Sequence, residues 1–94
     1  MNTNTRSPRF ALGQILIAPQ AQEQLETAEL RAALHRHARG DWGEIRPDAV
    51  ADNELGLCEG GSVCSVFRDA RDEQFCVMTN GSRSATLVLT WAEL

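Results

Sequence analysis

The feature that most constrains this fold is a turn in which two glycines flank a tryptophan: residues 39–44 read Arg-Gly-Asp-Trp-Gly-Glu. A helical pattern precedes the turn, and a carboxylate-rich helical pattern follows it. Gly40 is expected to end the first helix, because glycine accepts the left-handed conformation found just past helix ends. Gly43 allows the backbone to turn again. Trp42 therefore has a structural role in this interpretation, and we expect its large apolar ring to be buried beneath a sheet.

The sequence before the turn predicts a strand followed by helical residues. An apolar run over residues 10–18 predicts a strand whose second half is covered on both faces, and Pro19 ends it, since proline suits the first turn of a helix. Thr27 is a suitable N-cap for a helix over residues 28–39. A core-facing stripe with helical spacing is formed by Leu30, Ala33, Leu34, His37 and Ala38. Periodicity leaves open whether residues 20–40 form one bent helix or two short ones.

A third helix is predicted after the turn. Pro47 suits its first position, and the helix should run to about Cys58 and stop at the glycine pair of residues 60–61. Its inner face is formed by Ala49 or Val50, with Asn53 in a structural position and Leu57 beyond it. The carboxylates that this leaves pointing outward are Asp48, Asp52, Glu54 and Glu59.

The remainder of the chain predicts three strands, over residues 62–68, 74–79 and 85–90, with a hairpin signal at Asn80-Gly81. Residues 91–94 are too short to assign, and one option is that Trp91 and Leu94 dock on the core. The fold class is therefore α+β and two-layered, with an antiparallel sheet of about four strands and two or three helices packed on one face. The first strand is expected at an edge of this sheet. The single domain covers residues 9–94 and follows a flexible arm, residues 1–8.

Several classes of protein do not fit these 94 residues. No apolar run is long enough for a membrane span and no signal peptide is apparent, so we expect a cytoplasmic protein. Three cysteines without a Cys-x-x-Cys pair favour buried thiols over disulfides or a zinc site. His35 and His37 lie on different faces of a helix and cannot share a metal. Neither a phosphate-binding loop nor a dinucleotide-binding turn is present, so no catalytic residue, metal or cofactor is predicted.

The most informative charge pattern lies in the middle of the chain. Residues 41–60 contain six acids and only one arginine, Arg46. The six acids are the candidate partner-binding residues, Asp41, Glu44, Asp48, Asp52, Glu54 and Glu59. One interpretation is a solvated helix face. The other is that these carboxylates imitate a row of phosphates for a protein with a basic, nucleic-acid-binding surface.

Four segments carry a resemblance, in this order: Gly40-Asp41-Trp42-Gly43, Asp52-Asn53, Gly60-Gly61 followed by Ser-Val-Phe-Arg at residues 65–68, and Thr79 followed by Ser-Arg-Ser-Ala-Thr-Leu-Val-Leu at residues 82–89. Over residues 9–94 the chain resembles a family of small, mostly uncharacterised proteins found on plasmids, phages and integrative elements of Proteobacteria. Relatives differ in having a longer link with a proline between the first two helical stretches, and a closing tyrosine. The resemblance implies an accessory protein that helps a mobile element survive host defence, of the anti-restriction or anti-CRISPR type.

Three functional hypotheses follow. The first is a non-enzymatic protein that uses the acidic segment and the tryptophan turn to bind and inhibit a defence complex, such as a Cas or restriction subunit, in the host bacterial cell. The second is a small DNA-associated regulator that uses a basic strip of Arg31, His35, Arg36 and Arg39, although an isoelectric point near 5.0 opposes direct binding to nucleic acid. The third is a structural subunit that forms a homodimer through an open sheet edge.

Overall fold

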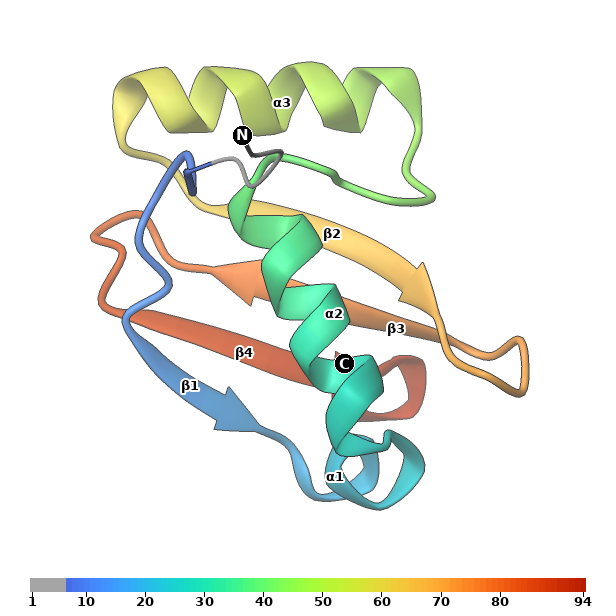
Figure 1. Ribbon diagram of the computed structural model, residues 1–94. Coiled ribbons are helices and arrows are strands. Elements are labelled where there is room, and N and C mark those ends of the chain that lie inside the picture. Colours follow the sequence, from blue (N-terminus) through green and yellow to red (C-terminus); the bar gives the residue numbers. More distant parts are fainter. Residues whose placement is uncertain (1–6) are drawn as a thin grey trace, which may run out of the picture.

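The computed structural model describes residues 7–94 and confirms the α+β architecture (Figure 1). The expected N-terminal arm, residues 1–8, lies mostly outside the described residues. In chain order the elements are β1 (Gln14–Ile17), α1 (Pro19–Gln24), α2 (Thr27–Ala38), α3 (Pro47–Glu59), β2 (Val63–Arg68), β3 (Gln74–Thr79), β4 (Ala85–Thr90) and a 3₁₀ turn, η1 (Trp91–Glu93).

The four strands form one sheet in the order β1-β4-β3-β2. The hairpins β2–β3 and β3–β4 are antiparallel, as predicted, whereas β1 pairs with β4 in parallel. The sheet is therefore mixed rather than purely antiparallel. Two successive hairpins give β2 and β4 the same direction, and β1 shares it. The edge position predicted for β1 is confirmed.

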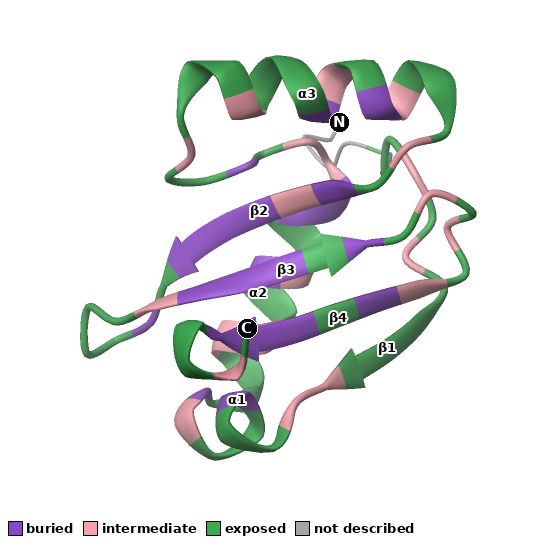
Figure 2. Cartoon of the chain, turned by 180° about the vertical axis from the view of Figure 1, so that it is seen from behind, coloured by how far each residue is buried: buried purple, intermediate pink, exposed green. Residues whose placement is uncertain are grey.

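The helices lie on one face and at one edge of the sheet. Helix α2 crosses one face and packs against β2 and β3, α1 contacts β4, and α3 lies beside β2 at the sheet edge (Figure 1). The main apolar cluster lies between α2 and the sheet and includes Ala33, Phe67, Phe75, Val77 and Val88. In the view from behind, no described helix covers the opposite face of the sheet (Figure 2).

Strand β1 differs most from its prediction. It is four residues long, and Ile15 and Leu16 are 37% and 44% exposed, so the expected cover on both faces is wrong. The reason is its position: β1 has a neighbour on one side only, and α2 lies over β2 and β3 instead. A turn at Gly13, with φ +67°, separates the strand from the preceding apolar residues.

Helix boundaries follow the sequence signals closely. Residues 20–40 form two helices, and the N-cap of α2 is Glu26 rather than Thr27, because the Glu26 and Glu29 side chains form a reciprocal capping box. Gly40 follows the end of α2 with φ +84°. Helix α3 begins at Pro47 and ends against Gly60, close to the predicted limits.

The last loop and the tail also differ from prediction. Between β3 and β4 the positive φ falls on Arg83, while the Asn80 side chain accepts hydrogen bonds from the backbone amides of Ser84 and Ala85. Trp91 and Leu94 are 50% and 63% exposed and do not dock on the core. Glu93 fastens the tail instead, because its carboxylate accepts hydrogen bonds from the first amides of α1.

Candidate functional site

The tryptophan turn closes the β2 edge of the sheet. The Val66 amide donates to the Trp42 carbonyl (3.0 Å), and the Glu44 amide donates to the Val66 carbonyl (2.7 Å). Gly43 lies between them with φ +72°, where an added Cβ would collide with the Val66 carbonyl oxygen. The turn thus needs glycine at this position for its positive φ and for its close approach to the backbone of β2. It occupies backbone groups of β2 that would otherwise be open at the edge.

Trp42 is buried, and it packs against aromatic side chains at the β2 edge of the sheet. Its ring stacks on Phe10 with centroids 6.0 Å apart and meets His37 edge-on at 5.7 Å. Only 5% of Trp42 is exposed. The cluster therefore joins the segment before β1, α2 and the turn that leads to α3.

An ion pair fastens α3 to the N-terminal segment. The Arg9 guanidinium donates to both oxygens of Glu54, at 2.7 and 3.0 Å, and the Trp42 indole nitrogen donates to the same carboxylate at 3.1 Å. The hydrogen bonds from Arg9 and Trp42 lower the pKa of Glu54 to about 2. Glu54 is thus engaged within the molecule, and the prediction that it points freely outward is wrong.

Asn53 provides the second attachment of α3. Its side-chain amide donates to the Cys64 carbonyl (2.8 Å) and accepts from the Cys64 amide (3.0 Å), so it pairs with β2 as a strand would. One turn further along, Arg83 donates to the Gly56 carbonyl at 3.2 Å. The inner side of α3 is therefore attached through its middle, at Asn53, Glu54 and Gly56.

The six predicted partner-binding acids have different surroundings. Two more of them pair with arginines from elsewhere in the chain: Asp41 with Arg36 at 2.7 Å, and Glu44 with Arg68 at 2.9 Å. Hydrogen bonding to Arg36 lowers the pKa of Asp41. The turn acids are therefore largely neutralised within the protein.

The remaining three acids lie on the outer side of α3. Asp48 pairs only with Arg46, and both side chains are more than 70% exposed, which makes a weak ion pair. Asp52 and Glu59 have no ion-pair partner among residues 7–94. Sequence reasoning missed this division because Arg9 and Arg68, which pair with Glu54 and Glu44, come from distant segments, and because the pairing of Arg36 with Asp41, five positions away, was not considered.

These acids share a face of the helix with one apolar residue. Asp48, Asp52, Leu55 and Glu59 follow the spacing i, i+4, i+7, i+11 and therefore form a single line along α3, which we call the outer stripe. Leu55 is 54% exposed. Exposed residues follow this side of α3 away from the sheet (Figure 2). Sequence reasoning overlooked Leu55, although its spacing from the acids was visible.

A buried polar chain lies beneath α2. His37 is fully buried between Ser65 on its Nδ1 side and Thr79 on its Nε2 side, and Thr79 hydrogen-bonds Thr86 at 2.7 Å. The Thr86 hydroxyl donates to the Leu12 carbonyl, which can only accept. Each hydroxyl has one proton, so Thr79 donates to Thr86 and His37 donates from Nε2. Nδ1 is then unprotonated and accepts from Ser65.

This arrangement favours a neutral histidine. Burial, aided by the charge of Arg83, lowers the pKa of His37 to about 4. Protonating Nδ1 would also take away the acceptor of the Ser65 hydroxyl. Ser65 is as completely buried as His37, so the pair has no access to a substrate and acts as a polar part of the core.

The cysteines and the basic strip only partly match their predictions. Cys76 is buried, but Cys64 is half-buried and Cys58 is exposed. A hydrogen bond from Cys76 lowers the pKa of the Cys64 thiol. In the basic strip, Arg36 is held by its ion pair and lies over the Phe67 ring at 4.5 Å. The strip therefore does not offer all its cations to a phosphate backbone.

Comparison with known proteins adds no identity: no family model, curated protein or solved structure matches the chain. Within residues 7–94, no helix has the length and apolar character needed to cross a membrane. The same residues contain no group of three or more His, Cys, Asp or Glu side chains placed to hold a metal ion.

Proposed function

We propose that this protein is a non-enzymatic accessory of a mobile element that binds and inhibits a host defence complex handling nucleic acid. The outer stripe of α3 is the binding surface. The observation that carries the proposal is the grouping of Asp48, Asp52 and Glu59 around the exposed Leu55 on one side of a helix whose other side is fixed.

The stripe has the chemistry expected for a partner with a basic surface. Carboxylates in a row attract arginine and lysine side chains that otherwise contact phosphates, and this raises the rate of encounter. Leu55 adds an apolar side chain to the stripe, which a phosphate row does not have, and this favours binding to a protein surface. The attachments at Asn53 and Glu54 keep the helix in place, so little ordering is required on binding.

The biological setting comes from the resemblance to small proteins of plasmids, phages and integrative elements. A restriction or CRISPR complex is the partner class that fits both that setting and an acidic stripe. The tryptophan turn, which we expected to contribute directly, supports the proposal differently: Asp41 and Glu44 are paired internally, and the turn positions α3.

The test is a charge reversal with a matched control. Asp52→Arg combined with Glu59→Arg changes two stripe residues that have no ion pair among the described residues. Replacing Glu59 in the last turn also removes an unfavourable interaction with the helix dipole, so the fold should tolerate the change. The control combines Glu23→Arg and Glu73→Arg, two exposed positions outside α3 with the same total charge change.

The assay is protection of a phage or plasmid in a host with active CRISPR or restriction. Protection should be lost with the stripe variant and retained with the control, while both variants keep the thermal unfolding midpoint of the wild type. Equal protection by wild type and a folded stripe variant would remove the outer stripe from the mechanism.

A further inference from the structure

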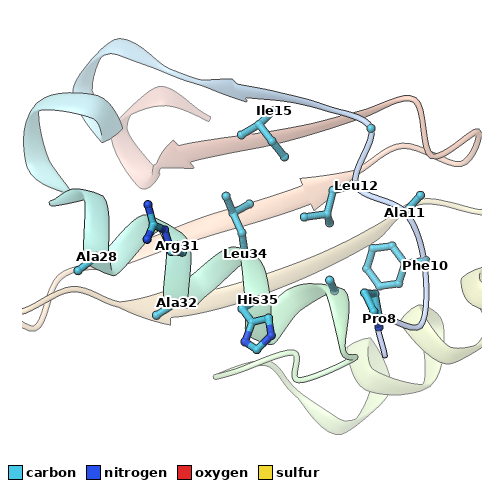
Figure 3. Close-up of a pocket in the computed structure, with 12 residues that line it drawn as sticks. Pro8, Phe10, Ala11, Leu12, Ile15, Ala28, Arg31, Ala32, Leu34 and His35 are labelled. Atoms are coloured by element: carbon cyan, nitrogen blue, oxygen red, sulfur yellow. The ribbon is translucent and has the colours of Figure 1, made fainter. Parts of the chain in front are cut away.

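A groove runs between α2 and the segment that leads into β1 (Figure 3). It has a volume of about 900 Å³ and lies on the same side of the sheet as α2. Its walls are mostly apolar, with Phe10 and Leu12 from the leading segment, Ile15 from β1 and Leu34 from α2. The groove is separate from the outer stripe of α3, and nothing in the proposed function uses it.

The groove borders a strand edge that is not paired. The amides of Gln14 and Ala18 donate to carbonyls of β4 or its preceding residue, both at 2.9 Å. Because backbone groups alternate along a strand, those of Ile15 and Ile17 point away from β4. Neither amide has a hydrogen-bond partner in residues 7–94. The other sheet edge is closed by the tryptophan turn and Asn53, so β1 is the edge available for pairing.

Among the described residues that line the groove, the one with a permanent charge is cationic, Arg31. Arg31 and His35, both on exposed positions of α2, are the polar side chains among its lining residues, and that lining contains no acid. Arg31 has no ion pair within the described part of the chain. An apolar surface with a cationic rim beside open backbone groups fits an apolar segment that also has a negative charge.

We propose that β1 and this groove bind an extended peptide segment of a partner protein, with apolar side chains at alternate positions and an acidic side chain beside them. The segment would pair with the outward backbone groups of Ile15 and Ile17 as a fifth strand. Alternate side chains would then enter the groove next to Ile15, and the acid would meet Arg31. A second copy of this chain fits less well, since it would present another cationic groove rather than an acid.

The probe is a random decapeptide library displayed on phage, selected against the whole protein. Enriched sequences should alternate apolar and polar residues and contain Asp or Glu, and a synthetic peptide of the most enriched sequence should bind in solution. Peptide binding should slow hydrogen exchange at the amides of Ile15 and Ile17. Failure to enrich any sequence, or enrichment of basic ones, overturns the proposal.

Two variants locate the site. Ile15→Pro removes an outward amide without removing a bond to β4, and should weaken binding by roughly tenfold or more, with Ile15→Val as its control. Arg31→Glu, on an exposed helix position, should weaken binding of the selected peptide by a similar factor. Arg71→Glu, in the β2–β3 loop, should leave its affinity unchanged. Unchanged affinity in a folded Arg31→Glu variant contradicts the proposal. The proposal is also contradicted if sedimentation detects a dimer that Ile15→Pro dissociates and the library yields no peptide.

Discussion

The buried polar chain of His37 makes stability depend on pH in a defined window. In the unfolded chain a histidine binds a proton below about pH 6.5, whereas folded His37 does so only below about pH 4. Between these values the unfolded state binds more protons, so the free energy of unfolding falls as the pH falls. Stability from this source is complete above about pH 7 and is lost progressively on the way to pH 4.

The size of the effect follows from the two pKa values. A shift from 6.5 to about 4 gives roughly 2 to 3 kcal/mol between pH 7.5 and pH 4.5. That is a large part of the roughly 5 to 15 kcal/mol expected for a small domain. The carboxylate of Glu54 titrates lower, with a pKa of about 2, so its contribution is lost mainly below this window.

Urea unfolding measured at pH 7.5, 6.0 and 4.5 provides the assay, with His37→Gln and His35→Gln compared with wild type. His37→Gln should be less stable at pH 7.5, and its stability should change little between pH 7.5 and 4.5. His35→Gln, altered at an exposed position, should keep the wild-type pH dependence. A flat wild-type profile, or an unchanged slope in folded His37→Gln, would refute the proposed proton arrangement.

Two further predictions concern the attachment of α3 and the tryptophan turn. Asn53→Ala should lower the free energy of unfolding by about 2 to 3 kcal/mol, because it leaves the Cys64 amide and carbonyl without their side-chain partner. Urea unfolding measures this loss. A loss below about 0.5 kcal/mol would contradict the prediction. Gly43→Ala should lower the free energy of unfolding by about 2 kcal/mol or more, because it places a side chain at a positive φ and against the Val66 carbonyl. The accompanying release of Trp42 should appear as a change in tryptophan fluorescence. A variant as stable as wild type would contradict the prediction.

Local signals predicted the regular elements well. The limits of β3 and β4 match the prediction, and α3 begins at Pro47 as expected and ends at Glu59, one residue beyond the predicted end and just before the glycine pair. Proline, glycine and runs of apolar residues act through their own backbone and immediate neighbours, so sequence alone reveals them. The four-residue β1 was harder, because whether an apolar strand is covered depends on where a distant helix packs.

Charge and polar contacts between distant segments were not predictable in the same way. Arg9 and Glu54 are 45 positions apart, and His37 and Thr79 are 42 apart, so neither pair leaves a local pattern. The sequence correctly located the surplus of acids but not which of them remain free. For Glu54 and Glu44 this division depends on Arg9 and Arg68, which only the folded chain brings near, whereas Arg36 lies five positions from Asp41.

The most direct test of the outer stripe is its effect on association with the defence complex that we propose as the partner. Association rates of purified wild type and of the Asp52→Arg, Glu59→Arg variant would be measured from low to physiological salt. Wild type should associate faster than the variant at low salt, and the difference should shrink as salt screens the charges. Equal rates for the two proteins at every salt concentration would contradict a binding role for these carboxylates.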